Sequence, residues 1–360
     1  MQDQGPQDLS RLDENFASAP VEDGLRWIDI RQFGLEGRGW TNTAHPFDRL
    51  PARAEGLVPD PVWQLGRLSA GLRVRLVTDA TAIAARWRVL FEPLGAPHMA
   101  ATCVSGLDLY VRDGAGWHWL ATGQPQEFPD NTGALAPDLS PGRRELMLYL
   151  PLYNGVASVA VGVPPEAFVG RVTEPQGGDA RPICFYGTSI VQGGCASRPG
   201  MAYPSILGRR LDRPFLNLGF SGNGRMEPAM ARLLAELDPS VYVLDCVPNL
   251  QPGEVTERVE PFVLALRAAR ADTPIVLVES MPYQDAAHRP ERHARYTAAN
   301  VALRRAFERL RAGGIDRVHY VQGDGLLGTD GEATVDGTHF TDLGFMRMAD
   351  ALEGLLRPLL

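Results

Sequence analysis

The chain has 360 residues, of which 44% are hydrophobic and 22% charged, and its formal net charge is −8 at pH 7. This length favours two domains over a single core, and the negative charge argues against a general nucleic-acid-binding role. All 35 basic residues are arginine, which excludes a P-loop lysine, a Schiff-base lysine and a Ser–Lys dyad. No stretch reaches the roughly 18 apolar residues of a membrane span, so none is expected.

The N-terminal residues 1–22 are polar and acidic, and we expect a flexible arm there. They lack the apolar segment of a signal peptide, which predicts a cytoplasmic protein; export stays open if a leader has been removed. The four cysteines show no C-x-x-C spacing, and Cys184 and Cys246 fall in predicted buried strands, where a free thiol acts as a small hydrophobe. The sequence leaves the oligomeric state open.

Residues 23–173 have the pattern of a β domain. Short alternating runs such as Leu72–Val77 are separated by Gly, Pro, Asn and Asp, and Asn154-Gly155 is a hairpin turn signal. No helical periodicity of any length interrupts these runs, which predicts a β-sandwich or jelly roll. Three aromatic residues are expected in its core or in cross-strand pairs, with a platform for a sugar ring as the alternative: Tyr110, Trp117 and Trp119.

Residues 174–180 form the predicted linker, and from 181 to 360 strands alternate with helices, the pattern of a parallel sheet. Five strands with helices on both faces predict a flavodoxin-like α/β fold. The strands are expected near Ile183–Tyr186, Phe215–Leu218, Val241–Cys246, Ile275–Glu279 and Val318–Val321. The helices are expected near Tyr203–Leu211, Glu227–Leu237, Glu254–Arg270, Pro290–Ala312 and Thr341–Leu355.

A serine lies in a glycine-rich turn directly after the first of these strands, in Gly187-Thr188-Ser189. Such a turn falls at the carboxyl edge of a parallel sheet, where ligands bind. Ser189 can project its hydroxyl into that crevice beside the N–H groups of the next helix. The structural alternative is that Thr188 and Ser189 only cap that helix.

A histidine follows an aspartate by three residues in Asp336-Gly337-Thr338-His339, just before the last predicted helix. On a tight turn the Asp336 carboxylate can reach Nδ1 of His339 and fix its tautomer. Nε2 is then free to take a proton from a serine. An isolated histidine beside an ordinary Asp-Gly turn is the alternative.

Two further predicted strands end in loops with glycine or asparagine, Ser221-Gly222 and Pro248-Asn249. With these, the chain resembles the SGNH (GDSL-type) hydrolase superfamily, whose four blocks supply Ser, Gly, Asn and His in that order. Thr188 stands where that family's eponymous Asp would be. The resemblance implies Ser189 as nucleophile, His339 as general base and Asp336 as the residue that orients it.

By the same resemblance, the backbone N–H groups of Ser189 and Gly222 and the side-chain amide of Asn249 would bind the oxyanion. A glycine allows close backbone approach to the substrate. Thr188, Tyr283 and Arg225 are candidate substrate contacts, although a solvated helix start is the alternative for Arg225.

The N-terminal region is similar to the small domain that accompanies one SGNH subfamily. The matching residues are Gly106-Leu107-Asp108-Leu109-Tyr110 and Leu150-Pro151-Leu152-Tyr153-Asn154-Gly155. Together the two resemblances cover roughly residues 25 to 357.

Rival sites are less well supported. Ser280 follows a strand but has no glycine turn around it. A metal site could combine Asp336 and His339 with another histidine (His98, His118 or His319), yet no known ligand spacing supports one. The stretch from Gly187 to Gly194 lacks the G-x-G-x-x-G spacing of a dinucleotide site. We expect neither metal nor cofactor.

These features predict a serine esterase that acts through an acyl-enzyme on Ser189. The expected substrate is a short acyl ester, with an O-acetylated carbohydrate as the first hypothesis. A lysophospholipase or thioesterase is the alternative enzyme, and it would need a wide apolar groove. An inactive carbohydrate-binding protein is the alternative from another class, although the four blocks are complete.

Overall fold

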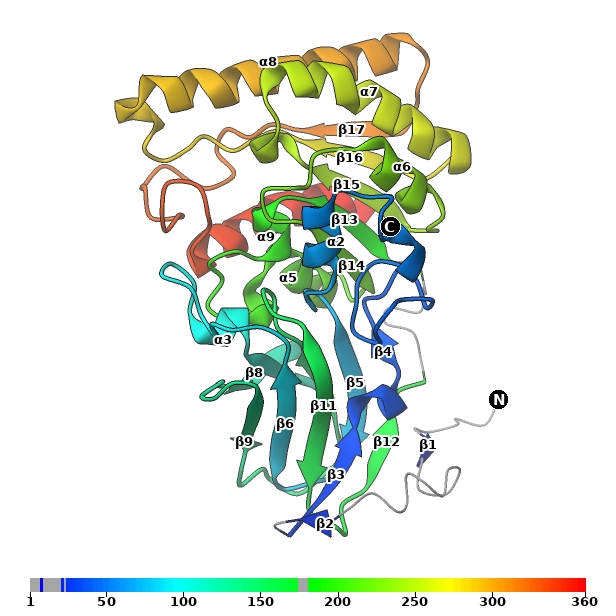
Figure 1. Ribbon diagram of the computed structural model, residues 1–360, viewed down its shortest axis with the longest axis vertical. Coiled ribbons are helices and arrows are strands. Elements are labelled where there is room, and N and C mark those ends of the chain that lie inside the picture. The colour runs from blue at the N-terminus through cyan, green and yellow to red at the C-terminus, as the bar shows by residue number, and fades with distance from the viewer. Residues whose placement is uncertain (1–6, 9–20, 23, 174–180) are drawn as a thin grey trace.

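The computed structural model describes residues 7–8, 21–22, 24–173 and 181–360. Three sheets are arranged in two layered domains, a β-sandwich and an α/β domain stacked end to end (Figure 1). Most of the predicted arm and all of the predicted linker lie outside the described residues. The described parts of the arm, Gln7–Asp8 (β1) and Val21–Glu22 (β2), pair with strands of the sandwich.

The sandwich consists of two antiparallel sheets. The first runs in the order β1-β12-β5-β10-β7-β8, with β4 also paired to β5, and the second in the order β2-β3-β11-β6-β9. Their other strands are Leu25–Asp29 (β3), Leu35–Glu36 (β4), Arg73–Thr78 (β5), Ile83–Val89 (β6), Leu107–Asp113 (β7), Gly116–Gly123 (β8), Asp130–Ala136 (β9), Arg144–Tyr149 (β10), Val156–Val163 (β11) and Val169–Arg171 (β12).

Side chains from both sheets fill one core, as the alternating pattern predicts. Val74 and Leu148 of the first sheet meet Trp87 and Val161 of the second. Two short helices also occur in this region, Asp60–Gly66 (α2) and Ala101–Val104 (α3). Both are too short to show helical periodicity in the sequence.

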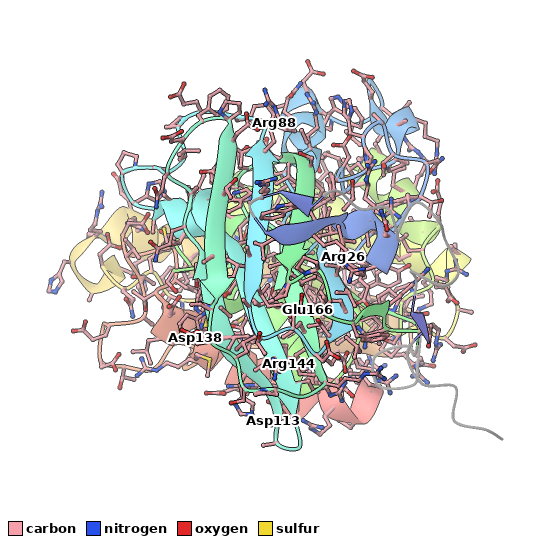
Figure 2. All side chains as sticks on the ribbon, turned by 90° about the horizontal axis from the view of Figure 1, so that it is seen from below. Arg26, Arg88, Asp113, Asp138, Arg144 and Glu166 are labelled. Carbon is pink, nitrogen blue, oxygen red and sulfur yellow. The ribbon has the colours of Figure 1, made fainter. Side chains whose placement is uncertain are left out.

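The outside of the sandwich carries charges of both signs. Seen from the side opposite the α/β domain (Figure 2), Arg26, Arg88, Asp113, Asp138, Arg144 and Glu166 lie around its strands. Arg88 pairs with Asp130 at 2.6 Å, and both side chains are more than half exposed. Exposed pairs of this kind contribute little to stability.

The α/β domain has a parallel sheet of the predicted strands in the order β14-β13-β15-β16-β17, a flavodoxin-like arrangement. The strands are Ile183–Gly187 (β13), Phe215–Gly219 (β14), Val241–Asp245 (β15), Ile275–Val278 (β16) and Val318–Val321 (β17). Every residue of the first four is buried, which is why they read as uninterrupted apolar runs.

Helices cover both faces of this sheet (Figure 1). Pro228–Ala235 (α6), Pro252–Ala269 (α7) and Pro290–Ala312 (α8) pack on one face; Ser189–Gln192 (α4), Tyr203–Arg210 (α5) and Asp342–Leu356 (α9) pack on the other. Because the strands are parallel, their carboxyl ends all lie at one edge of the sheet. The loops that hold Ser189, Gly222 and Asn249 all begin there.

The two domains share their hydrophobic cores. On the outer face of the first sandwich sheet, Met147 and Tyr149 belong to the same buried cluster as Phe185 and Phe215 of the α/β domain. Trp63 of α2 and its neighbours join the cluster on the other face of the parallel sheet. The sandwich is therefore packed onto the α/β domain on two sides rather than tethered to it.

Arg49, from the sandwich side, is fully buried at this joint. Its guanidinium donates to the carbonyls of Leu68, Leu65, Asn217 and Gly219 at 2.7–2.9 Å, the last two being in β14. Burial lowers the pKa of Arg49 to about 9, so the group is still charged at pH 7. One side chain thus holds main chain of both domains together.

Of the helices in the described part of the chain, none is both long and apolar enough to cross a bilayer.

Replacing Arg49 by methionine should destabilise the protein by about 3 kcal/mol or more, because several buried carbonyls lose their donor. Urea unfolding measures this loss. Arg53→Met is the matched control, since Arg53 pairs with Glu236 on the surface and should lose less than about 1 kcal/mol. Equal losses in the two variants would show that Arg49 does not hold the joint.

Candidate active site

Ser189 is the first residue of α4, directly after β13 and Thr188. The hydroxyl of Thr188 accepts from the N–H of Ile190 at 3.2 Å, so Thr188 caps the helix. Thr188 is completely buried and does not line the cavity at Ser189, contrary to its expected place as a substrate contact. Ser189 is the residue of this turn that faces the cavity.

Three side chains form a continuous chain of contacts at this point. Oγ of Ser189 lies 2.9 Å from Nε2 of His339, and Nδ1 of His339 lies 2.7 Å from Oδ2 of Asp336. The other oxygen of Asp336 accepts from the backbone N–H groups of Thr338 and His339, at 3.0 and 2.8 Å. This tight turn fixes the carboxylate and, through it, the imidazole.

Asp336 is held in its ionised form. Partial burial alone would raise the pKa of the carboxyl, but the hydrogen bonds from the His339 ring and from the backbone outweigh it and lower the pKa below its ordinary value. An ionised carboxylate at Nδ1 keeps the proton on that nitrogen. Nε2 is then left as the acceptor for the Ser189 hydroxyl.

The loop after β14 brings Gly222 to the same cavity. Gly222 has a φ of +69°, which a residue with a side chain rarely adopts. The loop is held from α4, because the N–H of Ser221 donates to Oε1 of Gln192 at 3.0 Å. Nε2 of Gln192 in turn donates to the carbonyl of Leu152, in the sandwich, at 3.0 Å.

Asn249 reaches the cavity from a 3₁₀ turn after β15, Val247–Asn249 (η6). Its amide is oriented by the glycine loop. With the amide oxygen toward that loop, it accepts from the N–H groups of Asn223 and Gly224, at 3.1 Å each. The NH₂ group of the amide then points away from the loop. It is an uncharged hydrogen-bond donor at the cavity that Ser189 and Gly222 also line.

The sandwich contributes to this site directly. The hydroxyl of Tyr153 donates to the carbonyl of Ser189 at 3.3 Å and also interacts with the Ser221 side chain. Burial raises the pKa of Tyr153, so the hydroxyl stays protonated. Tyr153 lies in the Leu150–Gly155 segment noted in the sequence, and it supports both Ser189 and the glycine loop from beneath.

The cavity at Ser189 has a volume of about 490 Å³. Its wall includes Tyr283, as expected, and two arginines of α8, Arg292 and Arg295. Arg292 lies over the Tyr283 ring at 4.4 Å and pairs with Asp285 at 2.6 Å. Arg295 donates to the carbonyl of Pro248 at 3.4 Å, next to Asn249.

Other candidate residues lie elsewhere. Arg225 pairs with Glu254 at 2.5 Å and does not line the cavity, so the expected substrate contact is not present there. Ser280 is buried, and its N–H bonds the Asn300 side chain. Of the other histidines considered for a metal, His118 contacts Asp113 on a surface hairpin and His319 lies in β17, whereas His98 lies near His339.

The aromatic residues of the sandwich are divided. Tyr110 is buried at the joint between the domains, Trp117 is half-buried against the same cluster, and Trp119 is 52% exposed. The guanidinium of Arg198 lies 5.5 Å from the Trp119 ring. Trp119 is thus the one of the three that is open to solvent, away from the Ser189 cavity.

Sequence reasoning missed the supporting residues. Tyr153 lies in the Leu150–Gly155 segment and Gln192 follows Ser189 by three residues. Both side chains bond backbone carbonyls, and no spacing in a sequence marks such a contact. The role of Arg49 could not be predicted, because a sequence does not show which of its arginines are buried. Arg292 and Arg295 of α8 also line the cavity, and no motif in the sequence marks them.

Comparisons with known proteins agree with this architecture. Residues 180–357 match the model of the GDSL-like lipase/acylhydrolase family, and residues 25–169 match the N-terminal domain of SGNH-hydrolase-type esterases. A crystal structure of a GDSL-like lipase from Bacteroides ovatus is 33% identical, with a TM-score of 0.88, over 93% of this chain and 98% of that one. The search of curated proteins found no match.

Two more distant structures share the fold. A salicylyl-acyltransferase from a tetracycline biosynthetic pathway is 19% identical with a TM-score of 0.73, over 94% of this chain and 98% of that one. An acetyl xylan esterase from the rumen bacterium Butyrivibrio proteoclasticus is 12% identical with a TM-score of 0.56, over 93% and 98%. The chain belongs to the GDSL-like lipase/acylhydrolase family and is a carboxylic ester hydrolase of the SGNH type.

Asn249→Ala should lower kcat by about 100- to 1000-fold and change KM little, because an oxyanion donor acts on the transition state and not on the bound ester. Steady-state kinetics on a p-nitrophenyl ester measures both constants. Asn223→Ala is the control: this side chain bonds the Ser221 carbonyl at 2.8 Å but does not line the cavity. A loss confined to KM, or equal losses in both variants, would argue against an oxyanion donor at Asn249.

Proposed function

We propose that this chain is a serine esterase that hydrolyses short acyl esters, acetyl esters above all, on a carbohydrate. The observation that carries the proposal is the unbroken set of contacts from Asp336 through His339 to Ser189, at 2.7 and 2.9 Å. A serine, a base and an orienting carboxylate in this order are the parts that acyl transfer needs.

In the proposed reaction, Oγ of Ser189 attacks the ester carbonyl carbon while its proton moves to Nε2 of His339. The oxyanion that forms is bound by the N–H groups of Ser189 and Gly222 and by the Asn249 amide. His339 then protonates the departing alcohol, which leaves an acyl group on Ser189. Water deprotonated by His339 attacks that acyl group, and the acid leaves as Ser189 recovers its proton.

The lining of the cavity supports a short acyl group. Beside the reacting residues, the apolar contributions come from Ile190, Pro248 and Tyr283, and the rest of the wall is polar or charged. A long acyl chain needs a continuous apolar surface to bury its methylene groups. The cavity at Ser189 does not provide one of that extent, which favours the esterase over the lysophospholipase alternative.

The polar side of the cavity supports a carbohydrate as the alcohol. The side chains of Arg292, Arg295 and Tyr283 line the same cavity as Ser189. Guanidinium N–H groups can donate to sugar hydroxyls, and an aromatic ring can lie against a sugar face. The Butyrivibrio proteoclasticus protein of the same fold is an acetyl xylan esterase, which is consistent with this substrate class.

A purely binding role has less support. An inactive relative would need neither the 2.7 Å nor the 2.9 Å contact, and both are present with Gly222 and Asn249 at the same cavity.

Hydrolysis of p-nitrophenyl esters from acetate to palmitate tests the proposal, followed by acetate release from acetylated xylo-oligosaccharides. The native protein should cleave acetate best, and Ser189→Ala should lower kcat by at least about 10⁴-fold, since no nucleophile remains. Ser280→Ala is the control at a neighbouring strand and should keep its activity.

A preference for palmitate would favour the lipid enzyme instead. Full activity of Ser189→Ala would overturn the nucleophile, and no hydrolysis of any ester by the native protein would favour the binding role.

A further inference from the structure

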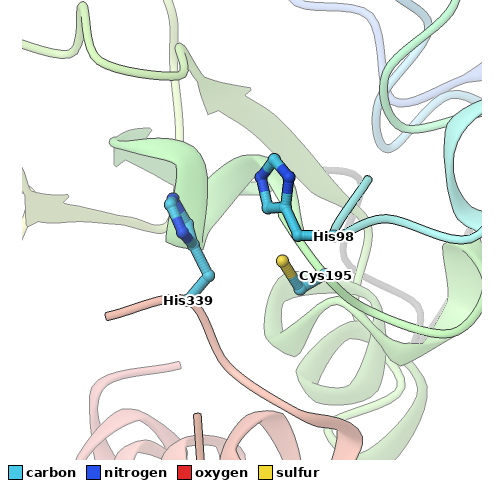
Figure 3. A group of neighbouring side chains, drawn as sticks. All are labelled: His98, Cys195 and His339. Carbon is cyan, nitrogen blue, oxygen red and sulfur yellow. The ribbon is translucent and has the colours of Figure 1, made fainter. Parts of the chain in front are cut away.

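Beside the catalytic imidazole of His339 lie two side chains that the hydrolysis does not use, His98 and Cys195. His98 and Cys195 lie beside His339 (Figure 3), and one ligand atom from each of the three lies within 4.8 Å of the other two. The rings of His98 and His339 are 5.8 Å apart between centroids. Within the part of the chain that the structure describes, this is the only such group found.

The three segments that carry these residues are tied to one another. His98 lies at the tip of a turn closed by two bonds between Ala96 and Met99, at 2.9 and 3.0 Å. Four residues after His98, the hydroxyl of Thr102 donates to the carbonyl of Ser197 at 2.6 Å. Ser197, two residues after Cys195, in turn donates to Asp342, three residues after His339, at 2.9 and 2.5 Å. The group is therefore held in place by the fold.

We propose that His98, Cys195 and His339 bind one zinc ion, and that zinc bound there inhibits the esterase. Two imidazoles and a thiolate are the ligands that zinc prefers, with bonds of about 2.0–2.3 Å in a tetrahedron. Such bonds bring ligand atoms to about 3.3–3.7 Å from one another. The three ligand atoms now lie within 4.8 Å of one another, so they must close by about an ångström. His98 is exposed and has room to move toward the other two ligands. Water completes the tetrahedron.

Binding releases one proton, from the Cys195 thiol to solvent, and nothing is oxidised or reduced. A coordinating metal deprotonates a thiol outright. The site therefore forms only when a soft-ligand metal is present, and magnesium or calcium, which prefer oxygen ligands, would not fill it.

Inhibition follows from the two contacts of His339. Its Nδ1 is bonded to Asp336 and its Nε2 to Ser189, so each ring nitrogen already has a catalytic partner. Whichever nitrogen binds zinc must give up one of these partners. The ion thus removes either the orienting carboxylate or the proton acceptor of the serine, and hydrolysis stops until the metal leaves.

Zinc binding can be measured without any substrate, so its failure is separate from failure of the proposed esterase activity. Metal-free protein competes for zinc with 4-(2-pyridylazo)resorcinol, and the native chain should take up one ion. His98→Ala and Cys195→Ser should each weaken zinc binding by at least about tenfold. Removing a residue that only orients a metal ligand already lowers metal affinity by about that factor, and removing the ligand itself should lower it at least as much. Ser189→Ala, which lacks hydrolytic activity, should bind zinc as well as the native chain.

His118→Ala is the matched control, since this exposed histidine contacts Asp113 on a distant hairpin and should not change zinc binding. In the esterase assay, zinc should inhibit the native protein and EDTA should restore it, while His98→Ala should keep its metal-free activity and resist zinc. The proposal is overturned if the native chain takes up no stoichiometric zinc, or if His98→Ala and Cys195→Ser bind it as tightly as the native chain. Zinc binding without inhibition would overturn its second part.

Discussion

The guanidinium of Arg49, which is buried and donates only to main-chain carbonyls, joins the sandwich to the α/β domain. Arg49 has no carboxylate partner among the ion pairs of the described residues, and its charge is shared by the carbonyl dipoles of four residues. Two of those carbonyls belong to β14, the strand that leads into the glycine loop. The position of that loop therefore depends on a residue of the other domain. Arginine suits this place because its fork has five fixed donors, whereas an ammonium is a compact point charge with three.

The same dependence recurs closer to Ser189. The carbonyl of Leu152 fixes Gln192, which fixes the N–H of Ser221, and the hydroxyl of Tyr153 holds the carbonyl of Ser189. None of these contacts touches a substrate. They set the positions of the backbone donors before an ester arrives, and preorganised donors need not be reoriented as charge develops on the oxyanion. The sandwich is in this sense a structural part of the active site.

Much of the α/β domain could be predicted from the sequence because its strands are buried on both faces and are therefore continuous apolar runs. His339 and Asp336 could be paired because they are three residues apart on one turn, so local geometry brings them together. Ser189 and Asn249 could be placed at one edge because parallel strands share the direction of their carboxyl ends. The helix α2 could not be predicted, since seven residues do not define a period. Nor could the ion pair that takes Arg225 away from the cavity, because its partner Glu254 lies 29 residues further along.

The buried clusters to which both domains contribute also limit how the sequence of this protein can evolve. Met147 and Tyr149 of the sandwich and Phe185 and Phe215 of the parallel sheet fill one interior. A gene rearrangement that attached a different domain at the junction would expose that interior and leave the glycine loop without its support. Each half therefore needs the other to cover its buried side chains. The rim of the cavity offers more freedom for change, because most side chains in the first turns of α8 are exposed.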